Sequence, residues 1–232
     1  MTGTLINVAT VLAGTGVGLT VGARLTERLQ QTVLSGLGLV TLVIGIDLAL
    51  AWGREGTTPN TPIVVLGGLL LGGLAGEALD LEGRLERVGA AVQRRLARDD
   101  RESTLAEGFV TASLLFCVGS LAVVGAIQDG LTGDYTTLAT KATLDGFAAI
   151  ALAASLGWGV GLAAVSVLLY QGAITLGAGI FDELLQGEAL MALTSVGGLT
   201  IVGIGLKLLG IKDVRVANFL PGLVFAPLLT AL

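Results

Sequence analysis

Histidine is absent from this sequence, so the usual acid–base residue near neutral pH and the commonest transition-metal ligand are both missing. Aromatic residues make up only 4% of the chain, which leaves few rings to stack on a bulky organic ligand. The motifs HExxH and GxSxG and a glycine–lysine phosphate loop are missing as well. The sequence therefore predicts neither an enzyme nor a bound cofactor.

Charged residues are scarce too, at 13% of the chain, whereas soluble proteins have about a quarter. Hydrophobic residues make up 53%, and the mean hydropathy is +0.86. The single cysteine, Cys117, stands among apolar residues and indicates nothing about the redox compartment. The net charge of −5 is spread over polar segments and does not indicate a partner such as nucleic acid. This composition is typical of an integral membrane protein.

Apolar runs divide the chain into about eight segments, and a helical crossing needs about 20 residues. They predict an all-α integral membrane protein with about eight transmembrane helices in a single membrane domain, residues 1–232. The segments are 4–22, 32–52, 63–79, 108–127, 141–157, 160–181, 189–209 and 217–232. The fifth is short and rich in alanine, which leaves open whether it fully crosses the bilayer. The N-terminus lacks a basic region and is interpreted as a crossing, not as a signal peptide.

Lysine and arginine gather in alternate polar segments, those after the first, third and seventh runs. The residues concerned are Arg24, Arg28, Arg84, Arg87, Arg94, Arg95, Arg98, Arg101, Lys212 and Arg215. The opposite side has only Arg54 and Lys141. Because short cytoplasmic loops are enriched in these residues, both termini are predicted to lie outside.

Residues 81–98 have a different pattern, within a segment, 80–107, that we expect to be cytoplasmic. Apolar residues recur there every three or four positions, at Leu81, Leu85, Val88, Val92 and Leu96. This spacing predicts a helix with one apolar face and arginines opposite. It is compatible with an amphipathic helix on the membrane surface and with a solvated linker helix.

Two parts of the chain share a layout: a glycine-rich span, a short charged loop with leucines, and a span that ends in VIGIDL or IVGIGL. They predict a repeat in which spans 1–3, residues 4–79, correspond to spans 6–8, residues 160–232. Spans 4 and 5, residues 108–157, lie between the two copies. Because five crossings separate equivalent spans, the copies run in opposite directions, an inverted repeat typical of transporters. The alternative is that two glycine-rich stretches look alike by composition alone.

Glycines spaced by four residues form two ladders, Gly14, Gly18 and Gly22, and Gly68, Gly72 and Gly76. Such ladders let membrane helices approach closely. They predict close packing within the chain, with a homo-oligomer through either ladder as the alternative.

Asp129, Lys141 and Asp145 lie at or inside the edges of the fourth and fifth runs. Ionisable side chains are costly there and therefore mark a candidate site. Lys141 and Asp145 are four residues apart, so on a helix they can pair, for function or only for structure. Asp129 is expected to meet them across the loop. Asp47 and Lys207 occupy equivalent segments of the two repeats, and we predict gating or interfacial roles for them.

Uncharged polar residues complete the predicted binding set: Asn7, Ser120, Gln171 and Asn218. Asn7 and Gln171 occupy roughly corresponding positions, and their amides offer donors and acceptors. Simple hydrogen bonding between helices is the alternative. Asn218 and Pro221 open a short last span, where freed carbonyls could face a cavity. Nothing in the sequence brings Ser120 close enough to Lys141 for a catalytic dyad.

Five ordered segments resemble a known family: GTLINVATVLAG, CVGSLAVVGAIQDGL, KATLDGF, LLYQGAITL and RVANFLPGLVFAPLL. They are similar to the bacterial membrane proteins called domain of unknown function 554. The resemblance implies a multi-pass protein of the bacterial cytoplasmic (inner) membrane and supplies no activity.

These observations predict a transporter or channel for a small solute or ion, coupled to Na⁺ or H⁺ through Asp145 or Asp129. The expected partners are the lipid bilayer and that solute or ion. The alternative is a scaffold or sensor that does not transport and acts through residues 81–98.

Overall fold

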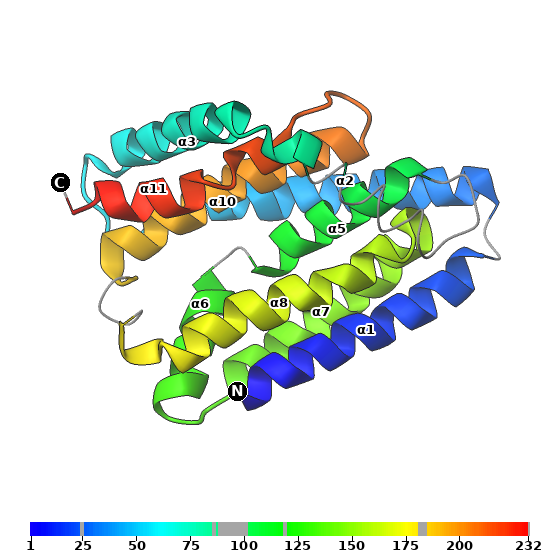
Figure 1. Cartoon of the computed structure of the whole chain (residues 1–232), viewed down its shortest axis with the longest axis horizontal. Helices are drawn as coiled ribbons and strands as arrows, with labels where there is room; N and C mark the ends of the chain where they lie inside the picture. The colour runs from blue at the N-terminus through cyan, green and yellow to red at the C-terminus, as the bar shows by residue number, and fades with distance from the viewer. Residues whose placement is uncertain (24–25, 85–86, 88–101, 118–119, 181–184, 232) are drawn as a thin grey trace. The chain divides into compact units, whose positions relative to one another are not determined.

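The structure is a computed structural model that describes residues 1–23, 26–84, 87, 102–117, 120–180 and 185–231 (Figure 1). Every secondary-structure element in these ranges is a helix, as predicted. Five helical segments are long and apolar enough to cross a membrane. They are α1 (Thr2–Gly22), Gln31–Gly53 within α2 (Glu27–Ala49) and η1 (Leu50–Gly53), α3 (Thr61–Ala78), α8 (Gly159–Leu176) and α10 (Gly187–Leu208).

The fourth predicted span is not one straight helix, which corrects the sequence-based expectation. It consists of α5 (Glu102–Cys117) and α6 (Ser120–Leu131), bent by 61°, and this pair is a sixth candidate span if it is counted as one. The carbonyl of Phe116, in the last turn of α5, accepts a hydrogen bond from the side chain of Lys141. A carbonyl at a helix end lacks an intrahelical donor, and here a side chain from another helix supplies one.

The structure also differs from the prediction at the fifth and eighth spans. Helix α7 (Thr136–Leu156) starts five residues earlier than expected and is long enough to cross, but its composition is not apolar enough to mark it as a candidate span. The eighth span is broken into η2 (Val216–Phe219) and the eight-residue α11 (Gly222–Leu229). Pro221 separates them, because proline has no N–H and its ring obstructs the carbonyl four residues earlier. Eight crossings therefore stay a prediction.

The helices form two compact units that share α2. In the first unit, α1 and α7 run parallel in very close contact, since their contacting residues advance together: Gly14 with Gly146, Gly18 with Ile150, and Gly22 with Ala154. Helix α8 runs antiparallel to α1, with Thr4 next to Thr175 and Thr15 next to Gly161. Helix α5 runs parallel to α8, with Leu105 next to Gly159 and, further along both helices, the Ser113 and Ser166 hydroxyls 2.9 Å apart.

In the second unit, α3 runs antiparallel to the segment that contains η2 and α11. Gly68, Gly72 and Gly76 meet Ala226, Gly222 and Asn218, respectively. The core between α3, α10 and α11 consists of Val65, Ala192, Val196 and Ala226. Both glycine ladders therefore pack against helices of the same chain, where a Cβ would not fit, and a homo-oligomer through them stays a prediction.

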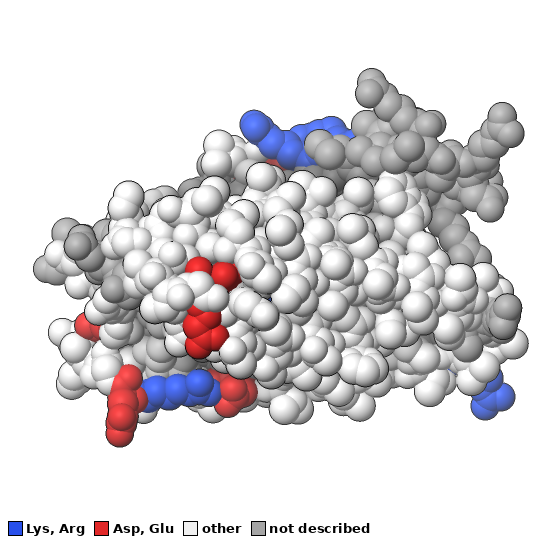
Figure 2. Space-filling model, turned by 90° about the horizontal axis from the view of Figure 1, so that it is seen from below, with Lys and Arg blue, Asp and Glu red and all other residues white. Residues whose placement is uncertain are grey.

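The outer faces of the helices are rich in exposed leucine, isoleucine and valine. On α3, the side chains of Ile63, Leu66, Leu70 and Leu74 are all more than half exposed. Figure 2 shows a face on which charged side chains gather in a few clusters and most of the remaining surface is uncharged. Such a surface suits contact with lipid. The predicted amphipathic segment lies mostly outside the described residues, which include only its helical start, 81–84, and residue 87.

Candidate functional site

Lys141 and Asp145 form an ion pair on α7, one helical turn apart, inside the first unit. Both residues are only 7% exposed. The Lys141 ammonium also donates to the Phe116 carbonyl, at 2.6 Å. This carbonyl lies in the last turn of α5, where the helix dipole favours a positive charge. The ammonium is thus held by a carboxylate and by a helix end.

Asn7 on α1 and Gln171 on α8 extend this pair into a four-residue polar cluster, and both amides are fully buried. Asn7 Nδ2 donates to Asp145 Oδ2 at 2.9 Å and to Gln171 Oε1 at 3.4 Å. These contacts determine how the amides are oriented. Turning either amide around would place an oxygen against the carboxylate or an N–H₂ group against another N–H₂ group.

The same chain of bonds leaves two buried polar atoms without a partner, Asn7 Oδ1 and Gln171 Nε2. One is an acceptor and the other is a donor. Two facing amides can form two hydrogen bonds with each other, but here only the bond from Asn7 Nδ2 to Gln171 Oε1 is made. Buried polar groups are nearly always paired, so these two atoms indicate a place for a hydrogen-bonding partner.

Asp129, which the sequence predicted to meet Lys141 and Asp145, is bound instead by the start of α1. It lies on α6, is 5% exposed, and accepts a hydrogen bond from the Gly3 N–H at 3.0 Å. The amino group of Met1 lies 2.9 Å from the same oxygen. Gly3 is one helical turn before Asn7, so Asp129 lies beside the cluster, and no hydrogen bond or ion pair in the described structure joins it to Lys141 or Asp145.

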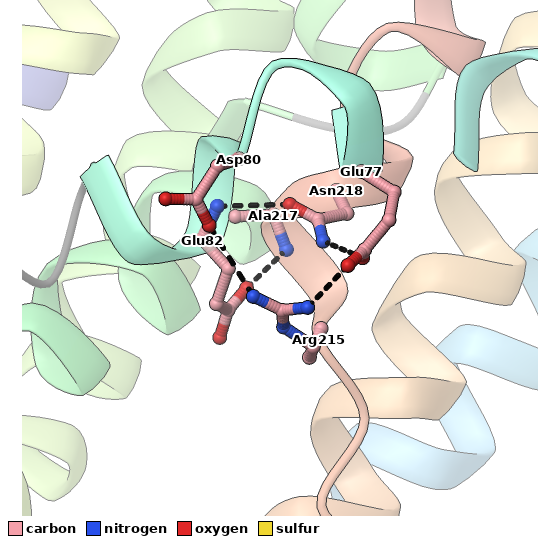
Figure 3. Close-up of polar contacts among 6 residues, drawn as sticks. All are labelled: Glu77, Asp80, Glu82, Arg215, Ala217 and Asn218. Carbon is pink, nitrogen blue, oxygen red and sulfur yellow. Dashed lines mark hydrogen bonds and ion pairs between the residues drawn. The ribbon is translucent and has the colours of Figure 1, made fainter. Parts of the chain in front are cut away.

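A second polar cluster lies in the second unit, around Asn218 (Figure 3). Asn218 Oδ1 accepts from the Glu82 N–H at 2.9 Å, and Glu82 Oε2 accepts from the Ala217 N–H at 2.8 Å. The Asn218 amide donates to Glu77, which also pairs with Arg215. Figure 3 shows Arg215 reaching Asp80 as well, at 3.3 Å. The cluster ties η2 to the end of α3 and to the turn that follows it.

The remaining predicted residues are distributed over the chain. Asn218 is in the second unit, so the structure does not bring it together with Asn7 and Gln171 in one unit. Lys207 lies 3.6 Å from Glu82 and 3.2 Å from Asp213, whereas Asp47 is exposed and pairs with Arg54 at 2.8 Å. The Ser120 side chain lies outside the described residues. Their proposed roles in gating or binding stay predictions.

Sequence reasoning missed Glu77, Glu82 and Arg215, because charged residues next to a polar segment look like an ordinary solvated loop. No local signal marks Glu82 either, since its partners Ala217 and Asn218 are more than 130 positions away in the chain. In the part of the chain that the structure describes, no group of three or more cysteine or acidic residues could hold a metal ion.

Asn218→Ala is expected to lower the free energy of unfolding by about 1 to 3 kcal/mol, because it leaves the buried Glu82 N–H without an acceptor. Thermal unfolding of the purified protein in detergent measures this change. Asn60→Ala is the control, since Asn60 is exposed and makes no side-chain bond at the start of α3. Equal melting temperatures for the two variants would contradict a stabilising role for the second cluster.

Apolar helices of membrane-crossing length, with buried ionisable and amide groups between them, define a multi-pass α-helical membrane protein. Residues 2–231 match the family described as "Protein of unknown function (DUF554)", and the chain belongs to this family, which confirms the resemblance seen in the sequence.

Two relatives match along nearly the whole chain. The "Uncharacterized membrane protein YdfK" of Bacillus subtilis (strain 168) is 34% identical over 227 residues, 98% of this chain and 94% of the relative. The "Uncharacterized protein YqgA" of Escherichia coli (strain K12) is 34% identical over 233 residues, 99% of this chain and 96% of the relative. No solved structure matches the chain.

Proposed function

We propose that this protein is a transporter that moves a small solute or ion across the bacterial inner membrane. The observation that carries the proposal is the buried cluster of Lys141, Asp145, Asn7 and Gln171, with its two unpartnered polar atoms. Ionisable residues inside a membrane bundle are costly and usually mark the pathway of a substrate or an ion. A transport role explains this cluster without any catalytic residue or cofactor in addition.

The directions of the helices within each unit support eight crossings. In the first unit, α1 and α7 point one way, and α5 and α8 point the other way. In the second unit, α2 and α11 point opposite to α3 and α10. Within each unit, taken by itself, these directions are the ones that eight successive crossings require.

The contact between α2 and α10 supports the inverted repeat, in which these helices are spans 2 and 7. Each helix has two glycines seven residues apart, Gly38 and Gly45 on α2, and Gly198 and Gly205 on α10. In the antiparallel pair, the α2 glycines Gly38 and Gly45 lie against Leu209 and Val202, and the α10 glycines Gly198 and Gly205 lie against Ala49 and Leu42. Equivalent residues thus occupy equivalent places on both sides of the contact, which is the arrangement expected of inverted repeats.

We assign the coupling to H⁺ or Na⁺ to Asp145, because its carboxylate is buried among groups from α1 and α7. In proteoliposomes with an internal pH dye and ²²Na⁺ outside, the native protein should show H⁺ or Na⁺ flux driven by an ion gradient. Asp145→Asn is expected to reduce this flux by at least about tenfold, since an amide can neither take up a proton nor balance a cation. Asp145→Glu should retain the ion dependence.

Asp134→Asn is the matched control. Asp134 is exposed between α6 and α7, and hydrogen bonds from the Thr136 hydroxyl and N–H lower the pKa of its carboxyl group. This variant should transport like the native protein. Melting temperatures in the same lipid separate a loss of flux from unfolding. A folded Asp145→Asn protein with native flux would exclude Asp145 from the mechanism.

A further inference from the structure

We infer that the cluster in the first unit binds a small solute with no net charge, which bridges Asn7 Oδ1 and Gln171 Nε2. This inference rests on the proposed transport function and names the class of its substrate. The two open atoms are an acceptor and a donor on neighbouring side chains, joined by the bond from Asn7 Nδ2 to Gln171 Oε1. A ligand that fits must therefore donate one hydrogen bond and accept another at adjacent atoms.

The charges of the cluster determine which class of solute this is. Lys141 and Asp145 compensate each other, and so do Asp129 and the Met1 amino group beside the cluster. The remaining polar residues, Thr4, Asn7, Gln171 and Thr175, are uncharged. A charged solute would add a further net charge to this site of low dielectric, on top of the coupling ion proposed at Asp145, which is strongly unfavourable. A primary amide or a zwitterion carries both a donor and an acceptor and adds no net charge.

The packing of the helices restricts the size of the solute. At Gly14, two turns after Asn7, α1 approaches α7 so closely that an added Cβ would lie 2.3 Å from the Gly146 carbonyl oxygen. On the other side of Asn7, a Cβ added at Gly3 would lie 2.5 Å from the Cβ of Leu138. Asn7 and Gln171 are fully buried between these contacts, so a ligand at their open atoms must be small, and bulky organic compounds do not fit.

Four probes of similar size test the inference on the purified full-length protein: acetamide, glycine, acetate and methylammonium. We expect acetamide, glycine or both to raise the melting temperature, with an apparent Kd at least about tenfold lower than for either ion. Acetamide and glycine distinguish a neutral amide from a zwitterion. Gln171→Met and Asn7→Leu keep the side-chain size and should remove the response.

A charge substitution keeps the test informative if those variants do not fold. Gln171→Glu at pH 8 adds a negative charge and should shift the preference toward methylammonium, which a purely structural amide would not do. A stronger response to acetate or methylammonium than to acetamide or glycine in the native protein would overturn the inference. The absence of a response to any probe would overturn it too, since a bound water would then satisfy Asn7 Oδ1 and Gln171 Nε2. If ion flux depends on Asp145 but neutral probes do not bind, this inference is rejected and the proposed transport function stands. Binding without flux would reject the transporter.

Discussion

Lys141→Met is expected to lower the free energy of unfolding by about 3 to 5 kcal/mol, the usual cost of removing one partner of a buried ion pair. The substitution leaves Asp145 buried without its cation and removes the donor to the Phe116 carbonyl at the end of α5. Both remaining groups are acceptors, and the surrounding helices admit little water to replace the ammonium. Thermal or denaturant unfolding in detergent micelles measures the loss.

The double variant Lys141→Met, Asp145→Leu should be much more stable than Lys141→Met alone. Replacing a buried ion pair by apolar side chains of similar volume is often neutral, because the cost of desolvating both charges disappears with them. Arg54→Met is the control at an exposed ion pair, the one with Asp47, for which we expect a change of about 0 to 1 kcal/mol. Additive effects of the two substitutions at 141 and 145 would show that the residues are not coupled.

Gly76→Ala is expected to be the most damaging single methyl addition, with a loss of at least about 3 kcal/mol, the upper end for overpacking in a core. An added Cβ would lie 1.9 Å from the backbone oxygen of Asn218, in the 3₁₀ segment η2. Backbone atoms cannot rotate away as a flexible side chain does, so α3 and η2 would have to separate. This would also break the bond between Asn218 and Glu77.

Gly16→Ala on α1 is the matched control, because nothing lies within 4 Å of a Cβ at this position. It should be neutral or stabilising by up to about 1 kcal/mol, since alanine restricts the unfolded chain more than glycine does. The melting temperatures of both variants in one detergent decide the prediction. Native stability for Gly76→Ala would mean that α3 and η2 are not in the contact described.

The individual residues of the candidate site could be predicted from the sequence, but the contacts among them could not. Lys141 and Asp145 were predictable as a pair because four residues on one helix bring two side chains together. Asn7 and Asp145 are 138 positions apart in the chain, and a long-range hydrogen bond of this kind has no local signal. For the same reason, the sequence suggested that Asp129 meets Lys141, whereas the structure places it at the N–H of Gly3.

The membrane class and helical content followed from the amino-acid composition and the lengths of the apolar runs, because lipid imposes both requirements on every segment separately. Where a segment bends or breaks depended on the tertiary structure, as at Phe116, whose carbonyl is bonded by Lys141 from another helix. The partners of the buried polar groups likewise depended on which helices pack side by side. Hydrophobicity indicates that a segment lies out of water, and only long-range packing decides which of its residues face another helix.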